Sequence, residues 1–168
     1  MAKAKRWEWA HFLNTGTKWA ADATTGVVWS RINKGFTELT EDANAEVTEE
    51  QYIGDKNASA SVDRYAMSAG LDGVAFKDDA IFEVLDTIHR NRSTGEDCEY
   101  QLLNVDIYNP SGDTKPTYPA QIQPVVIEIT SWGGEANLQI GATLHYNGDP
   151  ILGTCTVADG VPTFTKAS

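Results

Sequence analysis

The sequence predicts a mainly β protein, an antiparallel β-sandwich or barrel with one packed α-helix and a long hairpin loop. Residues 138–146 alternate between apolar and polar side chains, as a half-buried strand does. Asn147-Gly148 and Asp159-Gly160 are turn dipeptides that tolerate positive φ, and each precedes another apolar segment. Helical spacing of apolar residues is convincing only in 78–92. These three observations together favour strands over helices.

The N-terminal third predicts two strands and then a charged segment. Trp7, Trp9, His11 and Leu13 share one parity, and 27–32 is a second apolar stretch that ends at Gly35. Residues 38–55 carry seven carboxylates and no basic side chain, so we expect a long, charged hairpin or loop outside the core, followed by a strand at about 61–68. The seven carboxylates are Glu38, Glu41, Asp42, Glu46, Glu49, Glu50 and Asp55.

The middle of the chain predicts a turn and the helix. Gly70 and Gly73 flank Asp72 and are interpreted as turn residues. The helix over 78–92 has Asp78 or Asp79 as its N-cap, and Gly95 is placed to terminate it. Its apolar stripe centres on Leu85, which we expect to pack against a sheet.

Two further segments change the phase of their apolar pattern. In 98–108 the apolar parity shifts at Leu102-Leu103, which indicates either a bulge or a strand that is buried on both faces. Apolar and polar residues alternate in 125–130, but Trp132, beside Gly133-Gly134, is out of phase with them. This indicates a bulge or the end of the strand. The C-terminal third, with strands at 138–146, 151–157 and 161–165, predicts an antiparallel meander.

The length and charge of the chain narrow its class. A chain of 168 residues fits a single domain. Thirteen basic against twenty-four acidic residues give a net charge of -11, which disfavours a surface that binds phosphates or anionic membranes. No stretch is apolar over the roughly 20 residues of a membrane span, and no secretory signal precedes the first strand. We therefore expect folding in a cytoplasm, with Cys98 and Cys155 as reduced core thiols.

No catalytic, cofactor-binding or metal-binding pattern stands out. The three histidines lie in unrelated segments without metal-ligand spacing, and there is no nucleophile elbow or glycine-rich phosphate loop. The acidic set in 38–55 lacks the ligand ladder of a calcium loop, so a solvated or partner-facing surface is the preferred interpretation. We expect a protein that is not an enzyme and needs no cofactor.

Tryptophan is abundant and leaves a second function open. A carbohydrate-binding β-sandwich could stack sugars on exposed tryptophan rings, whereas core or subunit-interface packing is the preferred explanation. A virion decoration protein is a related alternative within the same class of binding modules. The five tryptophans are Trp7, Trp9, Trp19, Trp29 and Trp132.

A series of short motifs resembles one known family. The segments 29–39 and 51–57, the helix from Asp78-Asp79 to 92–95, and the C-terminal glycine pattern through Asn147-Gly148-Asp149 and Gly153-Thr154 follow one another in order. In this order and spacing, the chain resembles the major tail proteins (tail tube proteins) of long-tailed siphophages. The resemblance covers roughly residues 29–164.

The resemblance implies a fold and an assembly. It implies one tail-tube-like domain over 1–168, similar to the type VI secretion haemolysin-coregulated protein, with arms at about 1–12 and 161–168. It also implies six-membered rings that stack into a tail tube, the conduit for genome ejection, with a long hairpin and the arms joining successive rings. The implied partners are copies of the chain and the tape measure, tail terminator and baseplate proteins. The implied location is the virion tail, after assembly in the host cytoplasm.

The acidic charge gives a further expectation within this resemblance. DNA passing through a tube must not be bound, and a ring of carboxylates repels phosphates. We therefore expect a negative lumen, with cations such as Lys3, Lys5, Arg6 and Arg90 outside it or in subunit contacts. The segment 38–55 is expected to lie in the lumen or between rings, and residues 38–56 are expected to be ordered by a neighbouring subunit. The strands at 104–108 and 139–146 are candidate lumen or interface strands.

Overall fold

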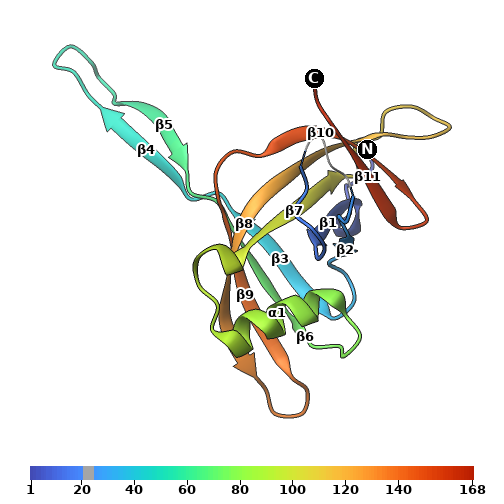
Figure 1. Cartoon of the computed structure of the whole chain (residues 1–168). Coiled ribbons are helices and arrows are strands. Elements are labelled where there is room, and N and C mark those ends of the chain that lie inside the picture. Colours follow the sequence, from blue (N-terminus) through green and yellow to red (C-terminus); the bar gives the residue numbers. More distant parts are fainter. Residues whose placement is uncertain (21–24) are drawn as a thin grey trace.

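The computed structural model describes residues 1–20 and 25–168 (Figure 1). Within them, strands form most of the regular structure, and the elements are η1 (Arg6–Glu8), β1 (Trp9–Asn14), β2 (Trp29–Arg31), β3 (Phe36–Asp42), β4 (Ala45–Glu50), β5 (Ser59–Tyr65), β6 (Ser68–Val74), α1 (Ala80–Asn91), η2 (Gly95–Cys98), β7 (Glu99–Asp106), β8 (Tyr118–Gly133), β9 (Gln139–Tyr146), β10 (Ile151–Ala158) and β11 (Val161–Lys166). All strand pairs are antiparallel. The predicted mainly β fold with one packed helix is confirmed.

One curled sheet contains every strand except β4 and β5. Its main path runs β2-β1-β7-β8-β9-β6-β3, and the β10–β11 pair attaches to β8 beside this path. The 16-residue β8 pairs with β7 along one edge; along its other edge it pairs first with β10 and then with β9. The sheet therefore wraps into a half-barrel around the side that α1 covers (Figure 1).

The predicted C-terminal meander is wrong in part. The β10–β11 hairpin forms, with Asp159 and Gly160 both at positive φ. However, β9 pairs with β6 and β8 rather than with β10. At Asn147-Gly148 the chain passes from the part of β8 that pairs with β9 to the part that pairs with β10. There the Gln123 side chain donates to the Gly148 carbonyl at 3.1 Å. The turn dipeptide therefore connects two strands that both pair with β8, instead of closing a hairpin between them.

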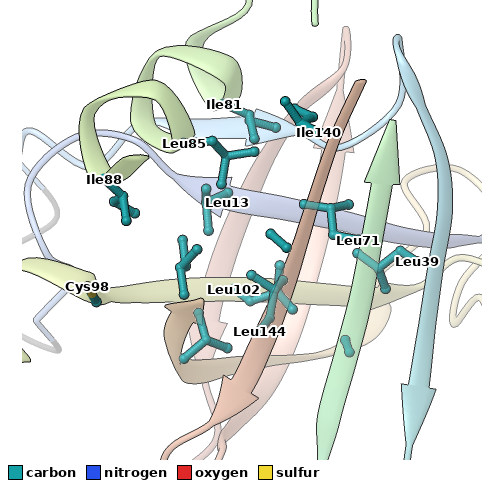
Figure 2. Close-up of a cluster of buried hydrophobic side chains, with 14 residues drawn as sticks. Leu13, Leu39, Leu71, Ile81, Leu85, Ile88, Cys98, Leu102, Ile140 and Leu144 are labelled. Carbon is teal, nitrogen blue, oxygen red and sulfur yellow. The ribbon is translucent and has the colours of Figure 1, made fainter. Parts of the chain in front are cut away.

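The central strands β1, β7 and β8 are buried on both faces. Leu13 and Leu102 pair across β1 and β7 and belong to the cluster beneath α1 (Figure 2). The residues of opposite parity, Phe12 and Leu103, pair with each other and belong to a second cluster, which β10 and β11 cover. The register of β7 with β8 runs without a bulge from Glu99 to Val105. Burial on both faces therefore explains the phase shift at Leu102-Leu103.

The second phase change has a different cause. The register of β8 with β9 shifts between Ile129 and Ser131, which marks a bulge, and the strand ends at Gly133. The bulge puts Trp132 opposite Ile140. Its ring then stacks on His89 of the helix, with the ring centroids 4.3 Å apart.

The helix begins and ends almost where the sequence predicts. The Asp79 carboxylate accepts the backbone N–H groups of Ile81 and Phe82, as an N-cap does. The C-terminus does not use Gly95: Arg92 takes the left-handed conformation there, with φ of 50°, and Gly95 instead begins η2. The predicted role of Gly95 as the helix terminator is therefore wrong.

The region around β3 departs most from the sequence prediction. Residues 36–42 are a strand of the main sheet, and Leu39 is only 5% exposed, so 38–55 is not wholly outside the core. This one leucine joins β3 to the core, because it pairs with Leu71 of β6, which pairs in turn with Ala142 of β9. The long hairpin spans 45–65 instead, and β5 begins at Ser59.

The two glycines flanking Asp72 lie inside β6, so their interpretation as turn residues is wrong. A Cβ atom on Gly73 would come within 2.5 Å of the Gly35 carbonyl oxygen. Close backbone approach, and not a turn, requires glycine there.

Parts of both segments expected to be terminal arms are strands. β1 begins at Trp9 and lies inside the sheet, and β11 pairs with β10 over its full length.

Cys98 and Cys155 are free thiols in separate clusters on opposite faces of the sheet. Burial raises the pKa of the Cys155 thiol to about 11.

We predict that Leu85→Ala lowers the free energy of unfolding by about 2–5 kcal/mol, because it leaves a cavity between the helix and the sheet. Leu85 is 1% exposed and faces Leu13 in the cluster (Figure 2). Urea unfolding of the monomer measures the change. Thr87→Ala, on the exposed side of the same helix, should change it by less than about 0.5 kcal/mol. Equal effects of the two substitutions would contradict this packing.

Candidate assembly surface

The hairpin of β4 and β5 projects away from the rest of the protein (Figure 1). Among the residues that the structure describes, the two strands pair only with each other, and every residue in both is exposed. A two-stranded hairpin is marginally stable in water when no other element packs on it. Its projection is therefore not explained by the stability of the isolated subunit.

The hairpin has one face that is more apolar than the other. Val47 and Val62 are cross-strand partners and are 51% and 53% exposed. The next pair on this face is Glu49 with Ala60. The opposite face carries hydroxyl and carboxylate side chains, among them Thr48, which bonds to Asp63. The valine face is uncovered within the described part of the subunit.

The tip of the hairpin combines apolar and acidic groups. Ile53 is fully exposed and Tyr52 is 67% exposed, which is costly for two large apolar side chains in a free subunit. The Tyr52 hydroxyl donates to the Glu50 carboxylate at 2.8 Å, and the Asp55 N–H donates to the Tyr52 carbonyl at 2.9 Å. The tip is thus a defined turn that presents side chains outward.

Asn44 fixes the base of the hairpin. It has φ of 44°, and its side-chain amide donates to the Ala66 carbonyl at 3.1 Å. The Ala66 N–H donates back to the Asn44 carbonyl at 3.3 Å. Above this base, Glu46 and Arg64 form an ion pair between the strands. These contacts set the direction in which the hairpin leaves the sheet.

The structure divides the seven predicted acidic residues into three groups. Three lie on β3, three on β4 and one in the hairpin turn: Glu38, Glu41 and Asp42; Glu46, Glu49 and Glu50; Asp55. Glu41 accepts the hydroxyl of Tyr146, and burial together with this bond raises the pKa of that tyrosine. The expected position of these residues in a lumen or between rings stays a prediction.

A buried polar pair lies between β1 and β7, which the sequence did not reveal. His11 and Asn104 are cross-strand partners, each 2% exposed, and the His11 Nδ1 lies 2.6 Å from the Asn104 Oδ1. The His11 Nε2 and the Asn104 Nδ2 have no hydrogen-bond partner in the described part of the chain. Because the Asn104 carbonyl oxygen accepts from Nδ1, the neutral ring leaves Nε2 as an unpaired acceptor.

His11 also lines a groove between the β1–β2 side of the sheet and β3. The groove has a volume of about 630 Å³ and is lined by the N-terminal segment, by 31–33 and by 36–40. Arg6 spans it, donating to the Trp9 carbonyl at 2.8 Å and to the Leu39 carbonyl at 3.0 Å. Arg31 is a second cation on the lining of the same groove, and Glu38 adds a carboxylate to it.

The tryptophans are mostly used in packing within the subunit. Trp19 packs edge-on against Phe164, and Trp9 packs edge-on against His11. Trp132 stacks on the helix, and Trp29 packs against the second cluster. Trp7 alone among the five is more than half exposed, at 59%. The tryptophans therefore do not form a row of exposed rings for sugar stacking.

Residues 1–20 and 25–168 contain no group of three or more His, Cys, Asp and Glu side chains that could hold a metal ion. In the same residues, no helix is both long and apolar enough to cross a membrane.

No protein-family model and no curated protein matches this chain. A solved structure of the tail of an empty GTA particle, obtained by helical refinement in C6 symmetry, contains a chain with a similar fold. The match has a TM-score of 0.53 at 13% sequence identity, and it covers 89% of this chain and 98% of the other. The similarity therefore extends over nearly the whole of both chains.

We predict that His11 makes the subunit less stable in acid. Burial is the main cause that lowers the pKa of His11 from 6.5 to about 4; the Asn104 bond opposes this, and the charges of Arg6 and Arg31 add to it. Between these two pH values the unfolded chain binds the proton and the folded chain does not. The free energy of unfolding is therefore not reduced by His11 above pH 6.5. It falls by up to about 1.4 kcal/mol per pH unit as the pH drops toward 4.

His11→Gln removes this titration but keeps a polar side chain at the site. Urea unfolding of both proteins from pH 7.5 to 4 isolates the histidine, because all other groups titrate in both. The wild type should lose more stability than His11→Gln over this range. Parallel pH profiles would contradict a buried, neutral His11.

Proposed function

We propose that this protein is a structural subunit of a phage-like tail, and that it assembles into stacked hexameric rings which form the tail tube. The observation that carries this proposal is the shared fold with a chain from a C6-symmetric GTA tail, over 89% of this chain and 98% of that one. The motifs in 29–39, 51–57 and the C-terminal strands, which resemble tail tube proteins, support it independently of the fold.

The projecting hairpin supports an assembly role. Its valine face and its tip expose Val47, Val62, Tyr52 and Ile53, all on one two-stranded element. Burying each such side chain in a contact contributes about 1.5–3 kcal/mol, and a ring or a stack repeats the contact in every subunit. A second copy of the chain is the partner that a self-assembling protein always supplies. The hairpin is then a connector between subunits.

The charge of the chain suits a conduit for DNA. With a net charge of -11 per subunit, six copies around a bore would give a strong negative field if the carboxylates face inward. DNA would pass without specific binding, because phosphate affinity needs lysine and arginine contacts. In this proposal Lys3, Lys5, Arg6 and Arg90 lie outside the bore or in subunit contacts.

The other proposed partners follow from the same role. A tail tube subunit would contact the tape measure protein inside the tube, and the terminator and baseplate proteins at its two ends. Its location would be the virion tail, after assembly in the host cytoplasm. No catalytic activity is part of this function.

We predict that the concentrated wild-type protein forms six-fold rings or hollow tubes, visible by negative-stain electron microscopy. Replacing 45–65 by a short Gly-Asn-Gly turn should abolish assembly and leave the subunit folded, because β4 and β5 pair with no other strand in the described part of the chain. Circular dichroism and thermal unfolding provide the folding control. A wild type that stays monomeric, or a hairpin-deleted variant that forms normal tubes, would contradict the proposal.

We predict that the bore of the assembled tube is predominantly negative. A cryo-electron-microscopy structure of the tube locates each charged side chain relative to the axis. More carboxylates than cations should line the channel, with Glu and Asp side chains from several strands. A neutral or basic bore would refute the lumen argument, even if the protein forms a tube.

A further inference from the structure

The groove between β1–β2 and β3 carries two arginines against one carboxylate, Glu38, in an otherwise acidic protein. Arg6 and Arg31 both line it, and both charges act on the neighbouring His11. Within residues 1–20 and 25–168, neither arginine lies within ion-pair distance of a carboxylate, whereas Arg64 and Arg90 each have a carboxylate partner. Two guanidinium groups without an ion-pair partner at one groove indicate an acidic ligand.

The walls of the groove also include apolar side chains. Trp9, Ile32 and Phe36 contribute this apolar surface. An occupant with a carboxylate and an apolar side chain would match both the arginines and the apolar wall. The volume of about 630 Å³ lies within the range of pockets that hold such groups.

The hairpin tip carries this combination of groups. Glu50 and Asp55 provide carboxylates, with Glu49 beside them at the end of the valine face, and Tyr52 and Ile53 are the exposed apolar side chains. The whole segment 45–65 carries five carboxylates against one lysine and one arginine. The tip is therefore complementary to the groove in charge and in apolar character.

The tip is too far away to occupy the groove of its own subunit. About nine residues separate Asn44 from Ile53, and an extended strand rises roughly 3.3 Å per residue, so the tip lies roughly 30 Å from the hairpin base. The hairpin is also directed away from the sheet (Figure 1). A contact between the two sites must join different copies of the chain.

We propose that the acidic hairpin tip of one copy docks in the Arg6–Arg31 groove of a neighbouring copy. This inference rests on the proposed self-assembly and assigns its connecting contact. Arg31 is the main charge partner, because Arg6 already donates to two backbone carbonyls, whereas Arg31 makes one long bond of 3.5 Å to the Trp7 carbonyl. The contact is heterologous, so each subunit uses its hairpin once and its groove once, and the contact propagates from copy to copy. High salt should weaken it.

A charge-swap experiment tests this contact. Arg31→Glu and the double variant Glu49→Arg/Glu50→Arg should each raise the concentration needed for assembly at least tenfold, measured by sedimentation velocity and electron microscopy. The chain that carries all three substitutions should recover assembly at least in part, because the negative charge introduced at position 31 then attracts the positive charges introduced at positions 49 and 50. Lys115→Glu, a matched charge change in an exposed loop, should assemble as the wild type does.

The outcomes separate this inference from the proposed function. If the wild type assembles and Arg31→Glu assembles equally well, the groove contact is wrong while the tube function stands. Failure of the triple variant to recover assembly, with its subunits folded by circular dichroism, also overturns the contact. If the wild type itself does not assemble at any concentration, the proposed function fails, and this contact with it.

Discussion

Burial of both faces of the strands β1, β7 and β8 is the constraint on which the rest of the fold depends. Their two apolar faces need two covers, and the chain provides α1 on one side and the β10–β11 pair on the other. β8 satisfies both requirements because its 16 residues are long enough to pair with β10 and then with β9 on one edge. The sheet can then curl around the helix as a half-barrel (Figure 1).

This core leaves one element without a role in the subunit. β4 and β5 contribute no buried residue, yet they carry a pair of facing valines and two large apolar groups at the tip. Exposed apolar groups that gather on one surface mark an interaction site. The groove beside β3 has charges without partners, because Arg6 and Arg31 form no ion pair with a carboxylate within the described chain. A contact between copies would satisfy both.

Local signals in the sequence were sufficient for the span of the helix and for the β10–β11 turn. For β7 they left two alternatives, a bulge and burial on both faces, and the structure shows the second. They failed where the environment of a residue is set by a strand that is distant in the sequence. Leu39 is core because Leu71 pairs with it, and Gly73 is needed because Gly35 approaches it. The acidic run predicted an exposed hairpin correctly in kind, but it could not give the limits 45–65. The His11–Asn104 pair and the groove join residues far apart in sequence, so spacing gives no sign of them.

Hydrogen–deuterium exchange on the free subunit and on the assembled form tests the central claim most directly. The claim is that the hairpin is completed by a neighbouring copy. Amides of 45–65 should exchange fast in the free subunit and be strongly protected in the assembly, whereas the amides of β7 and β8 should be equally slow in both. Equal protection of 45–65 in the two states would contradict the account.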